Sequence, residues 1–307
     1  MTMKNANPDM LLRLAQADAF AHAVEYIDRR ENQELYDEVD KFDRYSQHPT
    51  HLKLRPGEYT DDTQMSCAVA EVLIERGMDA NADDFSRSFF RAFKRDPRDG
   101  YSRGFQKILE RATSPEHMRQ LIVPDSNRNG AAMRSVPLGC IPDVKRLMEI
   151  AGVQASVTHQ TWGGINSSIA VALMSHFALY DNRSFASMYN FCAKRQPAFE
   201  WFKTSWDGLV SPKNDPKNLG IGMTTAHAVH TLLVEETSLE GIMRRLIAWG
   251  GDTDSVASIA WGIASCRRQA EVVPEFMERD LESYENSSFG ASFLKSLSSQ
   301  LMDAFRR

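Results

Sequence analysis

Apolar residues recur at the three- and four-residue spacing of α-helices along most of the 307-residue chain. Alternating apolar and polar runs of the kind that form strands are nearly absent, so the sequence predicts an all-α fold. Asn7 is the expected cap of the first helix, Pro8 its first position, and Gly77 the end of the second. Helices are predicted within 7–27, 61–77, 114–123, 161–180, 223–236, 238–251 and 253–269.

Two polar segments interrupt this helical pattern. Residues 31–58 are rich in charged side chains, and residues 204–220 carry two prolines and several turn formers. Long loops in a compact domain are often functional lids, and a variable surface loop is the alternative for both segments. Neither segment marks a domain boundary, so we expect a single domain over residues 1–307.

Composition restricts the function classes. The formal net charge of −5 argues against a nucleic-acid-binding surface. No apolar stretch reaches the roughly 20 residues that span a bilayer, and residues 1–10 do not resemble a signal peptide. The four cysteines are scattered among apolar residues, which is typical of reduced core thiols in a cytosolic protein, and they lack the spacing of a zinc site. We therefore expect a cytoplasmic protein, and we expect it to be a monomer.

Two acidic corners lie far apart in the sequence, at the predicted starts of two apolar helices. Aspartate is favourable at any helix N-terminus, so one interpretation is that each corner merely caps its helix. Capping explains one or two acids, but not four acids flanked by hydroxyls at two sites. The residues concerned are Thr60, Asp61, Asp62, Asp252, Asp254 and Ser255.

The second interpretation is a metal centre that both corners build together. Carboxylate and hydroxyl oxygens are hard ligands that suit Mg²⁺, Mn²⁺ or Ca²⁺. Four carboxylates carry enough charge for two divalent cations and would repel one another strongly without them. Gly250 and Gly251 would let the backbone come close to such a centre.

Four motifs, in this order and at these separations, resemble the ADP-ribosylglycohydrolase family. They are GEYTDDTQMS (57–66), NRNGAAMRSVPLG (127–139), THQTWGGINSSIAVA (158–172) and GGDTDSVASIA (250–260). The stretch LKLRPGEYTDDTQMS is closest in pattern to the dinitrogenase reductase-activating glycohydrolases of that family. The resemblance extends from about Leu11 to Cys266.

The resemblance implies an orthogonal helical bundle with a binuclear Mg²⁺ or Mn²⁺ centre at the base of a cleft. It implies that the six residues of the acidic corners are metal ligands. Glu25 matches an acid near the substrate ribose, and Asp99 matches an acid near the scissile bond. Catalytic roles are thus expected for Glu25, Asp61 and Asp99, and substrate binding for Arg128, Asn129, Gly130 and His159.

The chain also departs from the family pattern. Relatives commonly begin with a stretch like GDALGAPVE, where this chain reads ADAFAHAVE (17–25). Ala17 and Ala21 therefore replace glycines and His22 adds bulk, while Asp18 and Glu25 remain. Arg128 replaces a glycine. Ile221 stands where many relatives carry an aromatic residue beside the adenosine.

The implied function is hydrolysis of the N-glycosidic bond between ADP-ribose and a modified protein side chain, most of all arginine. One alternative is a catalytically impaired protein of the same fold that binds ADP-ribosylated targets or blocks a toxin. Another is a hydrolase of a different linkage, such as ADP-ribosylserine. The expected partner is an ADP-ribosylated protein, with neither nucleic acid nor integral membrane contact.

Several other side chains are expected to be structural. His227 and His230 lie three apart on a predicted helix without an obvious carboxylate partner, so we expect them on a packed helix face. The segment HPTH (48–51) is expected to be a loop without a ligand role. Trp162, Trp249 and Trp261 are predicted to pack in the core, whereas Trp201 and Trp206 lie near the second polar segment.

Overall fold

The structure is a computed structural model that describes residues 2–215, 217–285 and 287–306. Within these ranges the chain forms helices and two isolated bridges but no strand, which confirms the all-α prediction. The α-helices are α1 (Met10–Ala21), α2 (Gln33–Val39), α3 (Asp61–Arg76), α4 (Ala82–Arg95), α5 (Arg103–Arg111), α6 (Pro115–Leu121), α7 (Gly130–Met133), α8 (Val144–Ser156), α9 (Trp162–Tyr180), α10 (Met188–Ala193), α11 (Ile221–Glu235), α12 (Leu239–Trp249), α13 (Thr253–Ser265), α14 (Phe276–Arg279) and α15 (Ala291–Phe305). The 3₁₀ helices are η1 (His22–Val24), η2 (Gly77–Asp79), η3 (Val136–Cys140), η4 (Phe185–Ser187) and η5 (Pro197–Phe202).

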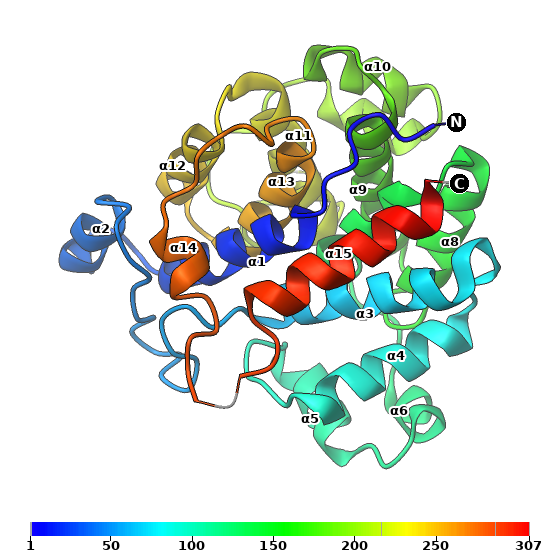
Figure 1. The fold of residues 1–307 in the computed structure, drawn as a ribbon, viewed down its shortest axis with the longest axis horizontal. Coiled ribbons are helices and arrows are strands. Elements are labelled where there is room, and N and C mark those ends of the chain that lie inside the picture. The colour runs from blue at the N-terminus through cyan, green and yellow to red at the C-terminus, as the bar shows by residue number, and fades with distance from the viewer. Residues whose placement is uncertain (1, 216, 286, 307) are drawn as a thin grey trace.

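Helix α1 occupies the centre of the bundle. It packs along α13 and also contacts α3 and α15, while α9 packs against α8 and α11 (Figure 1). Leu11, Leu12 and Leu14 of α1 are all fully buried, as expected for a helix that is apolar on every side. This packing brings the first turns of α3 and α13, which are distant in sequence, to the same region of the molecule.

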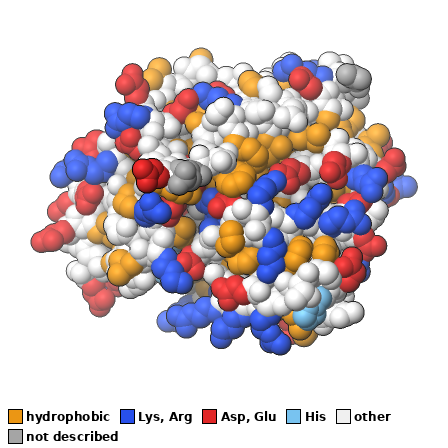
Figure 2. Space-filling view, turned by 60° about the horizontal axis from the view of Figure 1, so that its bottom comes forward, with side chains coloured by type: hydrophobic (Ala, Val, Ile, Leu, Met, Phe, Trp, Pro, Cys, Tyr) orange, Lys and Arg blue, Asp and Glu red, His pale blue; other side chains and the backbone are white. Residues whose placement is uncertain are grey.

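The surface carries charges of both signs. Basic and acidic side chains are intermixed over much of the face shown in Figure 2, where a short row of basic side chains follows one edge. Among the described residues, no helix is long and apolar enough to cross a membrane. The four cysteines are buried and free, as the sequence predicted.

The boundaries of α1 differ from the prediction at both ends. The helix begins at Met10 rather than at Pro8, because residues 7–10 form a turn in which the Met10 N–H donates to the Asn7 carbonyl at 3.2 Å. The side chain of Asn7 instead donates to Ser265 Oγ at 3.0 Å. At the other end α1 gives way to η1, and Tyr26 has a φ of 52°. This turn directs the chain after α1 towards the start of α13, where the Tyr26 N–H donates to the Gly251 carbonyl at 2.8 Å.

Helix α3 has the boundaries that the sequence predicted. Thr60 is its N-cap and accepts a hydrogen bond from the Asp62 N–H at 3.2 Å. Gly77 ends the helix with a φ of 54°, a backbone conformation that favours glycine. The first acidic corner therefore lies on the first turn of a well-defined helix.

The polar segments and the tryptophans show where the pattern was less informative. Residues 31–58 contain only the short helix α2 and are otherwise irregular. The described part of the second segment, residues 204–215 and 217–220, contains no helix. Trp261 is buried, as predicted, and Trp249 is half-buried. The prediction for Trp162 was wrong, because its side chain occupies the first position of α9 and is 51% exposed.

Candidate active site

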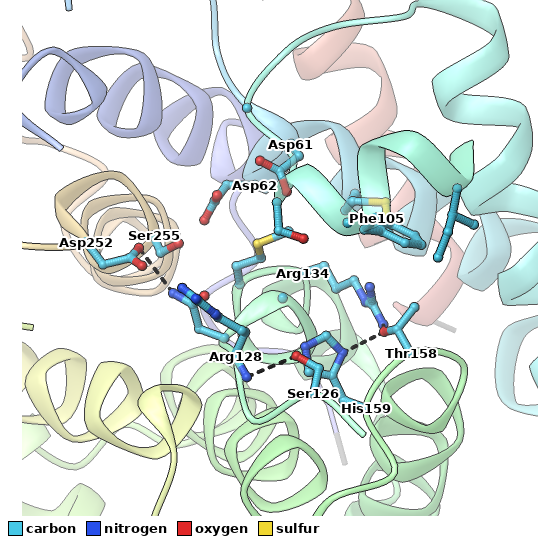
Figure 3. Close-up of a pocket in the computed structure, with 18 of the residues that line it drawn as sticks. Asp61, Asp62, Phe105, Ser126, Arg128, Arg134, Thr158, His159, Asp252 and Ser255 are labelled. Atoms are coloured by element: carbon cyan, nitrogen blue, oxygen red, sulfur yellow. Dashed lines mark hydrogen bonds between the residues drawn. The ribbon is translucent and has the colours of Figure 1, made fainter. Parts of the chain in front are cut away.

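A cleft of about 410 Å³ lies where the starts of α3 and α13 meet the segment after α1. This volume is within the range of small-molecule sites in proteins. One wall is acidic, and the opposite part is formed by α5, the loop after α6 and the start of α7 (Figure 3). The predicted site residues among its lining are Glu25, Asp61, Asp62, Arg128, Asn129, Gly130, His159, Asp252, Asp254 and Ser255.

Hydrogen bonds to a buried acid of α1, Asp18, fix the position of the first acidic corner. Asp18 accepts hydrogen bonds from the backbone N–H and the hydroxyl of Thr60, at 3.1 and 2.9 Å. It accepts two more from the N–H and hydroxyl of Thr63, at 3.1 and 2.5 Å. Four donors therefore fix the start of α3 against α1, and this fixes the direction in which Asp61 and Asp62 point.

The second corner is held by groups that themselves line the cleft. Asp252 accepts a hydrogen bond from the Tyr26 hydroxyl at 2.6 Å and from the Asn129 side chain at 3.1 Å. Asp254 accepts from the Ser255 N–H at 2.9 Å. A molecule entering the cleft would meet Tyr26 and Asn129 directly, so this corner is the one whose partners a ligand can change.

The two corners converge, as the metal-centre interpretation requires. Ser258, one turn into α13, donates to Asp62 Oδ1 at 3.2 Å. Glu25, Asp252 and Asp254 each offer a carboxylate oxygen, and these oxygens lie within 4.8 Å of one another. Residues that lie almost two hundred positions apart in the sequence therefore line the same cleft.

Burial and mutual repulsion raise the pKa values of these carboxyl groups. Burial, with the nearby charges of Asp254 and Asp18, raises the pKa values of Asp61 and Asp62 well above the usual range. Burial and the charge of Asp254 raise the pKa of Asp252 to about 6, against the hydrogen bonds from Tyr26 and Asn129. Such a group of oxygens carries an unfavourable charge at neutral pH, which bound divalent cations would offset. The donor set therefore fits hard divalent cations.

Glu25 connects the acidic wall to a histidine. His22 Nδ1 lies 3.3 Å from Glu25 Oε2 and 3.4 Å from Asp254 Oδ2. Burial alone would lower the pKa of His22, but the carboxyl groups of Asp254 and Glu25 outweigh this effect and raise it to about 10. Burial also raises the pKa of Glu25, while His22 opposes that change.

The opposite part of the cleft provides nitrogen groups. His159 Nδ1 forms a hydrogen bond with the Thr158 hydroxyl at 2.6 Å, while its buried Nε2 has no hydrogen-bond partner in the part of the chain that the structure describes. Burial, together with the charge of Arg134, lowers the pKa of His159 to about 3, so this ring is neutral. A side chain at Gly130 would meet the His159 ring at 3.0 Å, which explains the glycine.

Comparison with known proteins agrees with this arrangement. The sequence profile of the ADP-ribosylglycohydrolase family matches residues 9–307. The chain belongs to the ADP-ribosylglycohydrolase family.

Individual relatives support the assignment. The chain is 25% identical to ADP-ribosylhydrolase ARH3 of Xenopus tropicalis over 75% of this chain and 79% of that protein. It is 24% identical to the Homo sapiens protein of the same name, over 77% of this chain and 78% of the relative. A solved structure described as an ADP-ribosylglycohydrolase-related protein complex has a TM-score of 0.73 at 21% identity and covers 97% of this chain and 96% of its own. The last similarity shows the shared fold.

Two of the predicted site residues of this ADP-ribosylglycohydrolase, Thr60 and Asp99, lie beside the cleft and do not line it. The Thr60 hydroxyl is buried and faces Asp18 and Asp62. Asp99 lies 3.5 Å from Lys53 Nζ and accepts a hydrogen bond from Gln106 at 2.9 Å, while the adjacent Gly100 lines the cleft.

The glycines before the second corner have a different neighbour from the one expected. Gly250 and Gly251 have positive φ angles of 72° and 88°. A side chain at Gly251 would meet the Val210 carbonyl oxygen at 2.1 Å, so this glycine allows the close approach of the Val210 backbone. The Asp252 N–H donates to that same carbonyl at 2.8 Å, which anchors the corner to the loop before α11.

Sequence reasoning missed several groups that shape the site of this ADP-ribosylglycohydrolase. Tyr26 and Arg134 line the cleft, Asp18 holds the start of α3, and His22 lies beside the carboxyl group of Asp254. A buried polar residue within an otherwise apolar helix was an available signal for Asp18. Arg134 is buried, stacks 4.3 Å from the Phe89 ring, and donates to Gln154 Oε1 at 2.6 Å. No local pattern distinguishes Arg134 from a surface arginine.

The segment HPTH is also closer to the site than predicted. His48 Nε2 lies 3.0 Å from the Glu25 carbonyl oxygen and therefore donates to it. His51 Nδ1 lies 3.9 Å from Glu25 Oε2. The irregular segment around 48–51 thus packs against the residue that joins α1 to the acidic wall.

Proposed function

We propose that the protein removes ADP-ribose from modified protein side chains, most of all arginine, with the help of two divalent cations, Mg²⁺ or Mn²⁺. The observation that carries this proposal is the convergence of Glu25, Asp61, Asp62, Asp252 and Asp254 on one wall of a cleft in a chain of this family. The likeness of residues 52–66 to the dinitrogenase reductase-activating branch favours arginine as the modified side chain.

The cations would be held by the oxygens of the two corners, namely Thr60, Asp61, Asp62, Asp252, Asp254 and Ser255. When bound, they would polarise the ribose hydroxyls and an attacking water. Thr60 would have to exchange its hydrogen bond to Asp18 for such a contact, whereas the other five residues already line the cleft.

The other catalytic roles are assigned to individual side chains in and beside the cleft. Water adds to the anomeric carbon of the ribose as the bond from that carbon to the guanidine nitrogen breaks, through an oxocarbenium-like transition state. Glu25, or Asp61, takes the proton from water. The bond's electron pair goes to the departing nitrogen. This nitrogen takes up the proton released from the water and becomes part of a guanidinium group. Asp99 offers that group a negative charge near Gly100.

The opposite part of the cleft would bind the ADP moiety. Backbone N–H groups around Asn129 and Gly130, together with Arg128, would hold the diphosphate. The unpartnered Nε2 of the neutral His159 would accept or donate one hydrogen bond to the same ligand. The guanidinium group of Arg134 is buried and donates to the Thr158 hydroxyl at 2.8 Å, so it adds positive charge to this side of the cleft without being exposed to solvent.

The test is release of free ADP-ribose from arginine-ADP-ribosylated peptide in the presence of Mg²⁺ or Mn²⁺. Asp61→Ala and Asp254→Ala are each expected to lower the rate by roughly 10²–10⁴-fold, because each removes an oxygen of the acidic wall. Asp303→Ala, an exposed acid of α15, is the matched control and should retain the wild-type rate. Undiminished release by either cleft variant would contradict the proposal.

A second linkage, such as ADP-ribosylserine, is supported by the contacts of Asp99. This side chain is engaged by Lys53 and Gln106 and does not line the cleft, so its approach to a guanidinium group needs a rearrangement. Parallel assays with arginine- and serine-modified peptides distinguish the two linkages. Tight binding of either peptide without release would instead favour an impaired binding protein of the same fold.

A further inference from the structure

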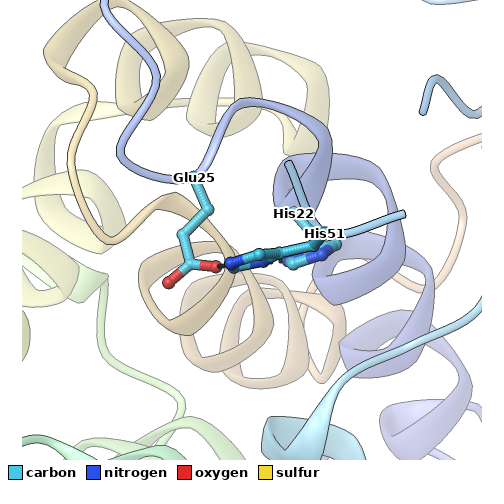
Figure 4. Close-up of side chains that lie close together, drawn as sticks. All are labelled: His22, Glu25 and His51. Carbon is cyan, nitrogen blue, oxygen red and sulfur yellow. Dashed lines mark ion pairs between the residues drawn. The ribbon is translucent and has the colours of Figure 1, made fainter. Parts of the chain in front are cut away.

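We propose that His22, His51 and Glu25 form a binding site for a transition-metal dication of the zinc class, beside the all-oxygen centre. The three side chains offer ligand atoms that lie within 4.8 Å of one another (Figure 4). The inference does not depend on the proposed hydrolytic function, because it concerns metal binding alone.

The first argument is the state of His22. His22 is 4% exposed, and neither of its ring nitrogens has a hydrogen-bond partner among the described residues. Buried polar atoms in proteins are nearly always hydrogen-bonded, so a ring with two unpartnered nitrogens needs an explanation. Nδ1 faces carboxylate oxygens of Glu25 and Asp254, and a metal cation bound there would take the place of the proton that these carboxyl groups otherwise stabilise on the ring.

The second argument is distance. In a tetrahedral zinc site with bonds of about 2.0–2.1 Å, neighbouring ligand atoms are about 3.3 Å apart. His22 Nδ1 lies 3.3 Å from Glu25 Oε2 and 3.4 Å from Asp254 Oδ2. His51 Nδ1 lies 3.9 Å from the same Glu25 oxygen. His22, Glu25 and Asp254 are therefore spaced like ligands of one cation. The His51 ring is stacked on that of His22, with ring centres 5.2 Å apart, and has to turn before its nitrogen can face the same cation.

The third argument is that His51 is free to move while its loop is anchored. The His51 side chain is 49% exposed. His48 fixes the loop, because its Nδ1 accepts from the N–H groups of Thr50 and His51, at 3.1 and 2.9 Å, and its Nε2 donates to the Glu25 carbonyl. Both nitrogens of His48 are thus occupied, which leaves His51 as the second imidazole ligand.

Ligand chemistry separates this site from the acidic wall. Imidazole nitrogens with a carboxylate favour Zn²⁺ and similar transition metals, whereas all-oxygen sites favour Mg²⁺ or Mn²⁺. Glu25 belongs to both groups of ligand atoms. A metal held by His22 and His51 would therefore hold the Glu25 carboxylate by one oxygen and restrict its contact with the second centre.

The test uses Co²⁺ as a spectroscopic substitute for Zn²⁺, added to the full chain in saturating Mg²⁺. We expect intense visible absorption bands of four- or five-coordinate Co²⁺ that saturate at one equivalent and disappear when Zn²⁺ is added. His51→Gln should weaken Co²⁺ binding by about tenfold or more, since even the loss of a residue behind a metal ligand costs that much. His117→Gln, a histidine of α6 outside the cleft lining, should leave the bands unchanged.

Two results would overturn the proposal. One is a wild-type protein that gives only the faint bands of six-coordinate, oxygen-bound Co²⁺. The other is a set of intense bands that persists in His51→Gln. His22→Gln provides a second variant from the buried side of the site, and its bands should be lost too. Circular dichroism of each variant shows whether it is folded, and binding is compared only among folded variants.

Discussion

The chain has two groups of histidines, and only one of them has a ring with carboxyl groups beside it. The site cluster, His22, His48 and His51, forms a stack of rings beside Glu25, with ring centres 4.2–5.2 Å apart. The core cluster consists of His227 and His230 on α11, which pack against the aromatic rings of Phe199, Phe202, Tyr189 and Trp206.

The difference lies in the carboxyl groups nearby. Two carboxyl groups next to His22 raise its pKa. Burial lowers the pKa values of His48 and His230 to about 4, and those of His51 and His227 below their usual range. The spacing of His227 and His230 on one helix would suit a metal, yet the rings are surrounded by aromatic side chains. The histidines of the site cluster lack helical spacing and still converge on an acid. Tertiary neighbours, rather than spacing, therefore decide which histidines are available for charge and metal chemistry.

The largest expected effect distinguishes the glutamates beside the two clusters, Glu25 and Glu235. Glu25→Gln should lower turnover by about 10²–10⁴-fold, because it removes the group proposed to take a proton from water. The matched variant is Glu235→Gln, near His230, whose acid is 35% exposed and pairs with Arg245. Its turnover should stay within about twofold of wild type, since it lies outside the cleft lining. Equal losses in the two variants would show that the clusters do not differ functionally.

Truncation of the core cluster should reduce stability instead. His230→Ala removes a buried ring that packs among three aromatic side chains, so we expect a loss of about 2–4 kcal/mol in the free energy of unfolding, as for other large buried side chains. His230→Leu keeps most of the volume and removes the unpartnered Nε2, and its loss should be smaller. Urea unfolding measures both. A loss below about 1 kcal/mol for the alanine variant would mean that the ring is not part of a well-packed core.

The core cluster should also make the fold sensitive to acid. The pKa of His230 is about 4 in the folded chain and near 6.5 in the unfolded chain, so only the unfolded chain gains a proton between these values. The stability associated with the neutral ring is complete above pH 6.5 and declines as the pH falls towards 4. Relative to wild type, His230→Leu should gain about 1–3 kcal/mol between pH 7.5 and pH 4.5. A difference between the two proteins that does not change with pH would contradict the lowered pKa.

This contrast also shows what the sequence could and could not predict. Periodicity was sufficient for the main helices, because α3, α9 and α13 bury nearly every residue that the pattern marks as apolar. The acidic corners were predictable because four acids with neighbouring hydroxyls are more than the capping of two helices requires. The packing of His227 and His230 against aromatic side chains agrees with the predicted packed helix face.

The features that the sequence did not predict lie mainly in segments without a regular pattern of apolar residues. His48 and His51 lie in an irregular loop, and no local pattern shows that such a loop packs against Glu25. Trp162 was misplaced because its type favours burial, while its position at the start of α9 leaves it facing solvent. For the two histidines, the decisive contact is made with a residue distant in the sequence.

The smallest expected effect separates two neighbouring histidines of the site cluster. His51→Ala should change the free energy of unfolding by no more than about 0.5 kcal/mol, because its ring is half-exposed and makes no side-chain hydrogen bond among the described residues. His48→Ala should cost about 1–2 kcal/mol, because its ring accepts two backbone hydrogen bonds and donates to the Glu25 carbonyl. Thermal unfolding in the presence of a chelator measures both variants without bound metal. A cost for His51→Ala as large as that for His48→Ala would assign His51 a structural role in the loop, whereas a negligible cost leaves its ring available for a ligand.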